Sequence, residues 1–192
     1  MLYKTLVFVV RPLAWLIFGY KKYGTENIPA EGPIIICANH IHGMDCVPVA
    51  VSNKRVINFI AKKELFKYRF LNWLFTTLNA IPVDRESADM KAYKETLKRL
   101  KEGKAICIFA QGTRASEIDI KAAKQGVALF ALMSGAPVIP ALITGKYRPF
   151  GKIAVRYGKP VTLEEYKGVK AKTEVLAEIT EKIMEKVSEL EK

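Results

Sequence analysis

Five short apolar runs, separated by helix-like segments, constrain the fold of this chain more than any other feature. The runs cover residues 34–38, 56–61, 80–83, 105–110 and 138–143. Continuous apolar runs of this length are typical of strands buried on both faces. A sixth segment, 153–157, alternates more and predicts an edge strand. We therefore expect a single α/β domain with a mainly parallel central sheet flanked by helices.

Helical periodicity fills the gaps between the runs. One helix is expected to begin after an N-cap at Ser87 and to end at Gly103. Two others are expected over residues 121–134 and 172–190. The apolar face of the first helix consists of Met90, Tyr93, Leu97 and Leu100. A chain of 192 residues suits one domain.

Charge and hydropathy together point to a membrane surface. The formal net charge is +12, yet half of the residues are hydrophobic and the mean hydropathy is +0.07. A chain this apolar is not disordered. Nucleic-acid binding explains the charge but not the hydropathy, whereas association with an anionic membrane explains both. We expect a membrane partner and no nucleic acid.

The N-terminal 23 residues are predicted to form an amphipathic, membrane-associating helical segment, followed by one domain over 24–192. Residues 2–20 are largely apolar, but Arg11 and Pro12 interrupt them in the middle, which disfavours a spanning helix. No small-residue cleavage site follows, which disfavours a signal peptide. Pro12 is where such a helix would break. The alternative is a helix packed on the protein's own core.

Both histidines of the chain follow the first apolar run, where open α/β sheets bind ligands. Asp45 lies five residues after His40, so its carboxylate can orient one imidazole nitrogen and leave the other as a general base. Two satisfied loop histidines are the simplest alternative. A metal site of His40, His42 and Asp45 is another, although a fourth ligand is not obvious.

Cysteine chemistry is less favoured. Cys37, Cys46 and Cys107 lie in apolar stretches, as buried thiols of a reducing cytosol do. Such settings raise a thiol pKa, which disfavours Cys37 or Cys46 as a nucleophile paired with His40. The chain also lacks G-x-S-x-G, Walker A and G-x-G-x-x-G motifs. Without a nucleophile from the enzyme, the substrate hydroxyl must attack.

Basic residues follow three of the other predicted strands. Arg114 comes after Gln111, Gly112 and Thr113, and an arginine fork suits phosphate or carboxylate. The other candidates are Arg85, Lys62 and Lys124. Since parallel strands end at one edge of a sheet, these groups are expected to form an anion pocket beside His40.

Four motifs in this order resemble those of glycerolipid acyltransferases, and most closely of the bacterial 1-acylglycerol-3-phosphate acyltransferases. Residues 39–45 resemble the N-H-x(4)-D motif, and residues 81–85 resemble the second motif. Residues 109–114 (FAQGTR) and 138–141 (VIPA) resemble the third and fourth. The matches span residues 39–141 and make 24–192 the expected acyltransferase domain.

The resemblance implies an enzyme of phospholipid biosynthesis. His40, oriented by Asp45, would be the base for the sn-2 hydroxyl of lysophosphatidate, which takes an acyl chain directly from acyl-CoA or acyl-ACP to give phosphatidate. No cofactor or metal ion is implied, and the expected location is the cytoplasmic face of the cell membrane, peripheral or monotopic. The implied phosphate-binding residues are Arg85, Arg114, Lys62 and Lys124. The implied pocket residues are Asn39, Gln111, Gly112 and Thr113.

The chain departs from the family pattern in the third motif. Gln111 stands where the family has Glu, and Ala110 and Ala115 replace Pro and Ser. In the first motif, His42 stands where Ser is common. Two alternatives follow: another acceptor, such as glycerol 3-phosphate or another lysolipid, or a catalytically weak lipid-binding relative.

Overall fold

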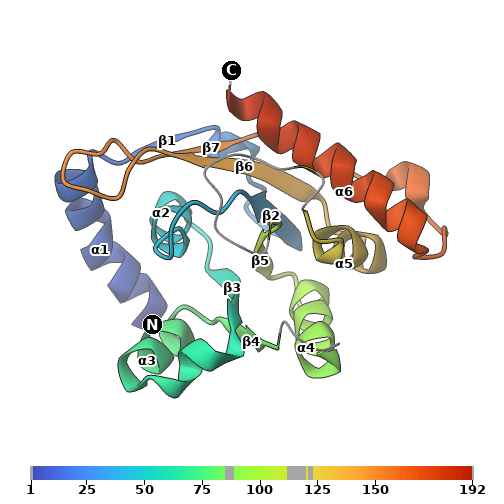
Figure 1. Ribbon diagram of the computed structural model, residues 1–192, viewed down its shortest axis with the longest axis horizontal. Coiled ribbons are helices and arrows are strands. Elements are labelled where there is room, and N and C mark those ends of the chain that lie inside the picture. The colour runs from blue at the N-terminus through green and yellow to red at the C-terminus, as the bar shows by residue number, and fades with distance from the viewer. Residues whose placement is uncertain (1, 85–88, 112–119, 121–122, 192) are drawn as a thin grey trace.

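A seven-stranded sheet forms the centre of the protein, as seen in a computed structural model that describes residues 2–84, 89–111, 120 and 123–191 (Figure 1). The strand order is β1-β7-β6-β2-β5-β3-β4. The five strands from β6 to β4 are parallel, β7 is antiparallel to β6, and β1 pairs parallel with β7. This confirms the mainly parallel α/β fold. The strands are β1 (Lys21–Tyr23), β2 (Ile34–Ala38), β3 (Ile57–Lys62), β4 (Ile81–Val83), β5 (Ala105–Phe109), β6 (Val138–Thr144) and β7 (Ala154–Tyr157).

Helices cover both faces of the sheet and make a three-layer structure (Figure 1). One face carries α1 (Leu2–Phe18), α2 (Cys46–Ser52) and α3 (Arg69–Thr77). The other face carries α4 (Met90–Lys101), α5 (Gly126–Ser134) and α6 (Thr173–Ser188). Short 3-10 turns are η1 (Thr25–Asn27), η2 (Lys63–Lys67), η3 (Glu164–Tyr166) and η4 (Glu189–Glu191).

Strand β2 shows why the central strands are apolar throughout. Ile34, Ile36 and Ala38 pack into the core under α1 and α2. Ile35 and Cys37 point the other way, into the core under α5 and α6. Because both faces are covered, no position in the strand can be polar without a buried partner. The three cysteines are free and buried, as predicted.

Three expectations need correction. The segment predicted as an edge strand, β7, lies inside the sheet because the short polar strand β1 pairs with its outer side. Helix α4 is capped by Asp89, whose carboxylate accepts the backbone N–H groups of Lys91 and Ala92, whereas Ser87 lies outside the described residues. Helix α5 begins at Gly126, later than residue 121; residues 121 and 122 also lie outside the described part.

Helix α1 continues through Pro12 without a break. Its inner face is buried against the core, and the Arg11 side chain donates hydrogen bonds to the carbonyls of Val51 and Asn53 at the end of α2. Its outer face remains apolar. The buried residues are Tyr3, Val7 and Ala14, and the exposed ones are Leu2, Phe8, Val9, Leu13, Trp15, Leu16 and Ile17. Among the described residues, no helix is both long and apolar enough to cross a membrane.

The adjacent strands β2 and β5 send their connections to opposite faces of the sheet. From β2 the chain passes through α2 to β3 on one side, and from β5 it passes through α5 to β6 on the other. Helices α2 and α5 lie on opposite faces of the sheet. Where the connections of two adjacent strands leave toward opposite faces, the carboxyl ends of those strands are the usual binding position in open α/β sheets.

Candidate active site

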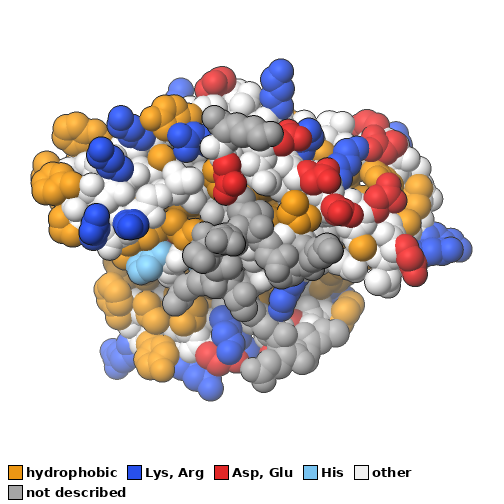
Figure 2. All heavy atoms as spheres, turned by 45° about the horizontal axis from the view of Figure 1, so that its top comes forward, with side chains coloured by type: hydrophobic (Ala, Val, Ile, Leu, Met, Phe, Trp, Pro, Cys, Tyr) orange, Lys and Arg blue, Asp and Glu red, His pale blue; other side chains and the backbone are white. Residues whose placement is uncertain are grey.

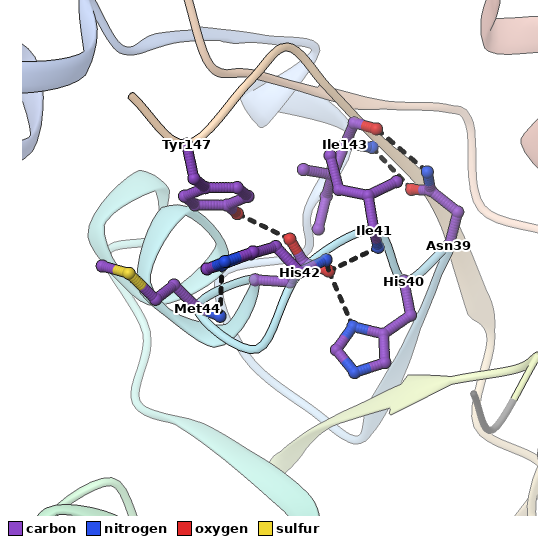
Figure 3. A network of polar contacts seen from close by, with 8 residues as sticks. Asn39, His40, Ile41, His42, Met44, Ile143 and Tyr147 are labelled. Atoms are coloured by element: carbon purple, nitrogen blue, oxygen red, sulfur yellow. Dashed lines mark hydrogen bonds and ion pairs between the residues drawn. The ribbon is translucent and has the colours of Figure 1, made fainter. Parts of the chain in front are cut away.

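The loop after β2 brings His40 and Asp45 together at the carboxyl edge of the sheet (Figure 3). Asp45 directly precedes α2, but its carboxylate turns back over the loop instead of capping the helix. Its Oδ2 lies 2.6 Å from His40 Nδ1 and accepts the backbone N–H groups of Ile41 and His42 at 2.7 and 2.8 Å. The five-residue spacing therefore produces the contact that the sequence predicts.

These contacts assign the tautomer of the neutral His40 ring. The carboxylate of Asp45 is fully buried and faces hydrogen-bond donors, so it acts as an acceptor. In the neutral ring, Nδ1 is accordingly the nitrogen that bears the proton, and Nε2 carries the lone pair. The His40 side chain is 15% exposed, so the ring is held in the protein but remains reachable. The pair has the geometry of an oriented general base.

Phe109 and Asn39 stabilise the surroundings of the base. The His40 ring stacks on Phe109, the last residue of β5, with ring centroids 4.4 Å apart. The buried side-chain amide of Asn39 donates to the carbonyl of Ile143 in β6 and accepts its N–H, at 2.9 and 2.7 Å. Asn39, predicted to line the substrate pocket, thus uses both amide atoms to join the ends of β2 and β6.

The predicted phosphate-binding residues divide into two groups. Lys62 ends β3 and lies 3.7 Å from Glu64, with its side chain about 43% exposed. Lys124 is exposed, and its backbone N–H donates to the carbonyl of Ala110 just after β5. Both stand at the carboxyl edge of the sheet. Arg85 and Arg114 lie outside the described residues.

The third motif is described as far as Gln111, which is buried. Ala110 donates its N–H to the carbonyl of Ala38, so Gln111 follows directly from a point tied to the end of β2. Gly112 and Thr113 lie outside the described residues.

An apolar cavity of about 240 Å³ lies beside Phe109, between β5, α4 and α5. Its walls include Ile108, Ala92, Val127 and Phe130, and the charged residues of its described lining are Lys124, Asp84 and Asp89. Phe109 therefore contacts both this cavity and the His40 ring, although His40 is not among the residues that line the cavity.

The two rival chemistries find little support. In the described part of the chain, no group of three or more His, Cys, Asp and Glu side chains is arranged to hold a metal ion. His42 instead accepts the N–H of Met44 and stacks on Tyr147. Burial raises the pKa of Cys37 and Cys46 to about 12, so neither thiol ionises readily near neutral pH.

Tyr147 is a site residue that the sequence motifs did not reveal. It lies in the loop between β6 and β7, and its hydroxyl donates to Asp45 Oδ1 at 2.6 Å (Figure 3). The available signal was weak: a tyrosine shortly after an apolar run, in the segment Thr144-Gly145-Lys146-Tyr147. Nothing in that segment indicates a partner 102 positions away.

Comparison with known proteins decides the family. A family model described as acyltransferase matches residues 19–144. The chain belongs to the acyltransferase family. It is 32% identical to a 1-acyl-sn-glycerol-3-phosphate acyltransferase of Bacillus subtilis, over 99% of this chain and 97% of that protein. It is also 32% identical to an enzyme of the same description from Streptococcus pneumoniae, covering 87% of this chain and 65% of that protein.

A solved structure supports the same assignment. The 1-acyl-sn-glycerophosphate acyltransferase PlsC from Thermotoga maritima superposes with a TM-score of 0.71 and 29% identity, covering 98% of this chain and 81% of that one. In this acyltransferase, the segment matched by the family model contains the loop from Asn39 to Asp45 and ends three residues before Tyr147. Tyr147 lies outside the matched segment, and its contact with Asp45 is found in the structure.

Proposed function

We propose that this acyltransferase transfers an acyl chain from a thioester donor to the sn-2 hydroxyl of 1-acylglycerol 3-phosphate at a membrane surface. The observation that carries the proposal is the 2.6 Å contact of His40 Nδ1 with buried Asp45, which leaves His40 Nε2 as an oriented base. The names of the relatives supply the acceptor, lysophosphatidate.

The chemistry needs one base and no covalent enzyme intermediate. His40 Nε2 takes the proton of the sn-2 hydroxyl as its oxygen attacks the thioester carbonyl carbon. The carbon–sulfur bond of the tetrahedral intermediate then breaks, the leaving thiolate takes the proton from imidazolium and departs as the thiol, and the ester remains on the glycerol. Asp45 stabilises the transient imidazolium charge. The high pKa of the buried thiols supports direct transfer over an acyl-cysteine route.

Lys62 and Lys124 are proposed to bind the acceptor phosphate, together with Arg85 and Arg114. Positive charge at the carboxyl edge supports this role, because phosphate is bound by lysine and arginine donors close to the reacting centre. The apolar cavity beside Phe109 is proposed to take an acyl chain, since apolar side chains make up most of its walls.

The membrane surface is proposed to contact a hydrophobic patch formed by the outer faces of α1 and α3. Leu2 of α1 and Trp73 of α3 line one shallow cleft, so the two helices are neighbours. Figure 2 shows hydrophobic side chains gathered on this part of the molecule, with lysine and arginine side chains among them and a histidine between two groups. The exposed residues of the patch include Phe8, Trp15 and Leu16 of α1, Phe70 and Trp73 of α3, and Tyr68 just before α3. This composition suits an interface with anionic lipid on the cytoplasmic face.

Replacing Phe8, Trp15 and Leu16 together with serine is expected to weaken binding to phosphatidylglycerol-containing vesicles about a hundredfold. Each side chain is exposed, and each is expected to contribute about 1 kcal/mol of transfer free energy when it enters the interface. Vesicle sedimentation measures the change. Truncating the helix is a poorer test because Tyr3, Val7 and Ala14 belong to the core.

A matched control replaces Met133 and Val169, which are also exposed apolar residues but lie outside the patch. Serine at these two positions should leave vesicle binding within about twofold of the unaltered protein, since neither is expected to reach the lipid. Equal binding by both variants would contradict a membrane-facing role for α1.

The decisive test of the reaction is mass spectrometry of the products formed from lysophosphatidate with acyl-CoA or acyl-ACP. Phosphatidate formed with at least one donor supports the proposal. Products formed only from glycerol 3-phosphate or another lysolipid would favour a different acceptor. If the protein binds lipid but forms no product with either donor, the result would favour the alternative that Gln111 suggests, a catalytically weak lipid-binding relative.

Gln111→Glu is expected to retain or raise kcat/KM for lysophosphatidate. If kcat/KM does not rise, we expect it to stay within about threefold of the value for the unaltered protein. The two side chains have the same length and shape, and the change restores the carboxylate typical of the family motif. Steady-state kinetics measures the effect, and thermal unfolding checks the fold, because a buried carboxylate can lower stability. A loss of tenfold or more in a folded variant would show that this site works differently from that of its relatives.

A further inference from the structure

The carboxylate of Asp45 is held from two directions. Its Oδ2 faces the donors of its own loop, namely His40 and the backbone N–H groups of Ile41 and His42. Its Oδ1 accepts the hydroxyl of Tyr147, which belongs to a different loop 102 positions later. The two groups of contacts fix both oxygens and hence the plane of the carboxylate.

Tyr147 is itself rigidly placed. Its ring stacks on His42 with centroids 4.4 Å apart, and the Phe18 ring at the end of α1 packs against it edge-on at 6.0 Å. The backbone around it is tied down, since Lys146 donates to the carbonyl of Gly151 at 3.0 Å and Phe150 donates to the carbonyl of Ile17 at 2.7 Å. The hydroxyl therefore stays fixed relative to the sheet and to α1.

The Tyr147 hydroxyl acts as a proton-bearing donor and not as a second base. Burial, and secondarily the negative charge of Asp45, raise the pKa of Tyr147 far above its usual value. The hydroxyl keeps its proton and offers it to the carboxylate. A neutral donor at 2.6 Å steadies the charge of Asp45 without neutralising it.

We propose that Tyr147 is a positioning residue for the proton-transfer pair, holding Asp45 in the plane that directs it at His40 Nδ1. The inference rests on the proposed function, because it assigns a role within that site. Without the hydroxyl, Oδ1 loses a fixed partner and the carboxylate can turn about its side-chain bonds. The imidazole then spends less time in the orientation that aims Nε2 at the acceptor hydroxyl.

The test is Tyr147→Phe, which deletes one oxygen atom and keeps the ring. We expect kcat for lysophosphatidate to fall about tenfold to a hundredfold, as for the loss of a hydrogen bond to a charged group, while KM changes by less than about twofold. The matched control is Tyr166→Phe, because the Tyr166 hydroxyl also donates to a carboxylate at 2.6 Å, that of exposed Glu178. The control should retain both kinetic constants.

A second readout needs no turnover. In proton NMR, the His40 Nδ1 proton shared with Asp45 should give a far-downfield resonance that shifts or broadens in Tyr147→Phe and not in Tyr166→Phe. Phe18→Leu loosens the packing of the Tyr147 ring but keeps the Tyr147 hydroxyl, so it should produce a smaller loss of kcat. This variant keeps the inference testable if Tyr147→Phe does not fold.

The outcomes separate this inference from the proposed function. If the unaltered protein makes phosphatidate and Tyr147→Phe has the same kcat, the positioning role is overturned and the proposed function stands. A fall in kcat with an unchanged downfield resonance also overturns it, because the effect would then arise elsewhere. Absence of acyl transfer by the unaltered protein overturns the proposed function, and the resonance then decides whether Tyr147 still orders the pair.

Discussion

Replacing His40 with alanine is expected to lower kcat/KM for lysophosphatidate about a hundredfold to ten-thousandfold. General-base catalysis contributes a factor of this size when a positioned group removes the proton of the nucleophile. Here the attacking oxygen belongs to the substrate, and the three thiols, buried and free, offer no substitute. Transfer from a radiolabelled thioester measures the loss, and thermal unfolding verifies that the variant folds.

Two comparisons make this result specific to the base. Added imidazole should restore part of the activity of His40→Ala, because removing a ring that is 15% exposed leaves a site open to small molecules. His42→Ala should cost only a few-fold, because His42 packs on Tyr147 and its side chain does not contact the carboxylate of Asp45. Activity of His40→Ala within threefold of the unaltered enzyme would contradict its role as the base.

The central strands could be predicted closely because their environment leaves one solution. Strand β2 occupies the predicted residues 34–38, and β5 and β6 begin where predicted, at Ala105 and Val138. Each of these strands has neighbours on both sides and helices on both faces, so its residues must be apolar. Burial on both faces therefore leaves a continuous apolar run that can be recognised in the sequence.

The edge of the sheet could not be predicted in the same way. Strand β1 consists of Lys21, Lys22 and Tyr23, all exposed, and forms by pairing with β7. An exposed edge strand needs no apolar run, so its sequence carries no burial signal. Without β1, the alternating segment at β7 looked like the edge. The N-cap of α4 was misplaced for a different reason: Ser87 and Asp89 are both suitable caps and lie only two residues apart.

The site divides along the same line between local and distant contacts. The His40–Asp45 contact spans five residues in one loop, so a tight turn after a strand was enough to predict it. The bonds from Asn39 to Ile143 and from Tyr147 to Asp45 span 104 and 102 positions. They depend on β6 lying beside β2, and no motif in the chain specifies which strands are neighbours.

Replacing Asp45 with alanine is expected to reduce both activity and stability. The variant leaves partly buried donors without their acceptor, among them the backbone N–H groups of Ile41 and His42. An unsatisfied buried donor costs about 1–3 kcal/mol, so we expect the free energy of unfolding in urea to fall by about 2–4 kcal/mol. We expect kcat/KM to fall about a thousandfold, because His40 loses both its orientation and the charge that stabilises imidazolium.

Asp45→Asn separates these two losses. Its amide oxygen can take the place of Oδ2 and keep the N–H groups of the loop, while its NH₂ group takes the place of Oδ1 and donates to the Tyr147 hydroxyl oxygen. His40 then keeps its proton on Nδ1, while the negative charge is lost and the Tyr147 hydroxyl proton loses its acceptor. We expect the free energy of unfolding to change by less than about 1 kcal/mol and kcat/KM to fall about tenfold to a hundredfold. If Asn and Ala lower kcat/KM equally while Asn preserves stability, the charge of Asp45 is the whole of its contribution. If Asn retains full activity, Asp45 acts only through the position it gives to His40.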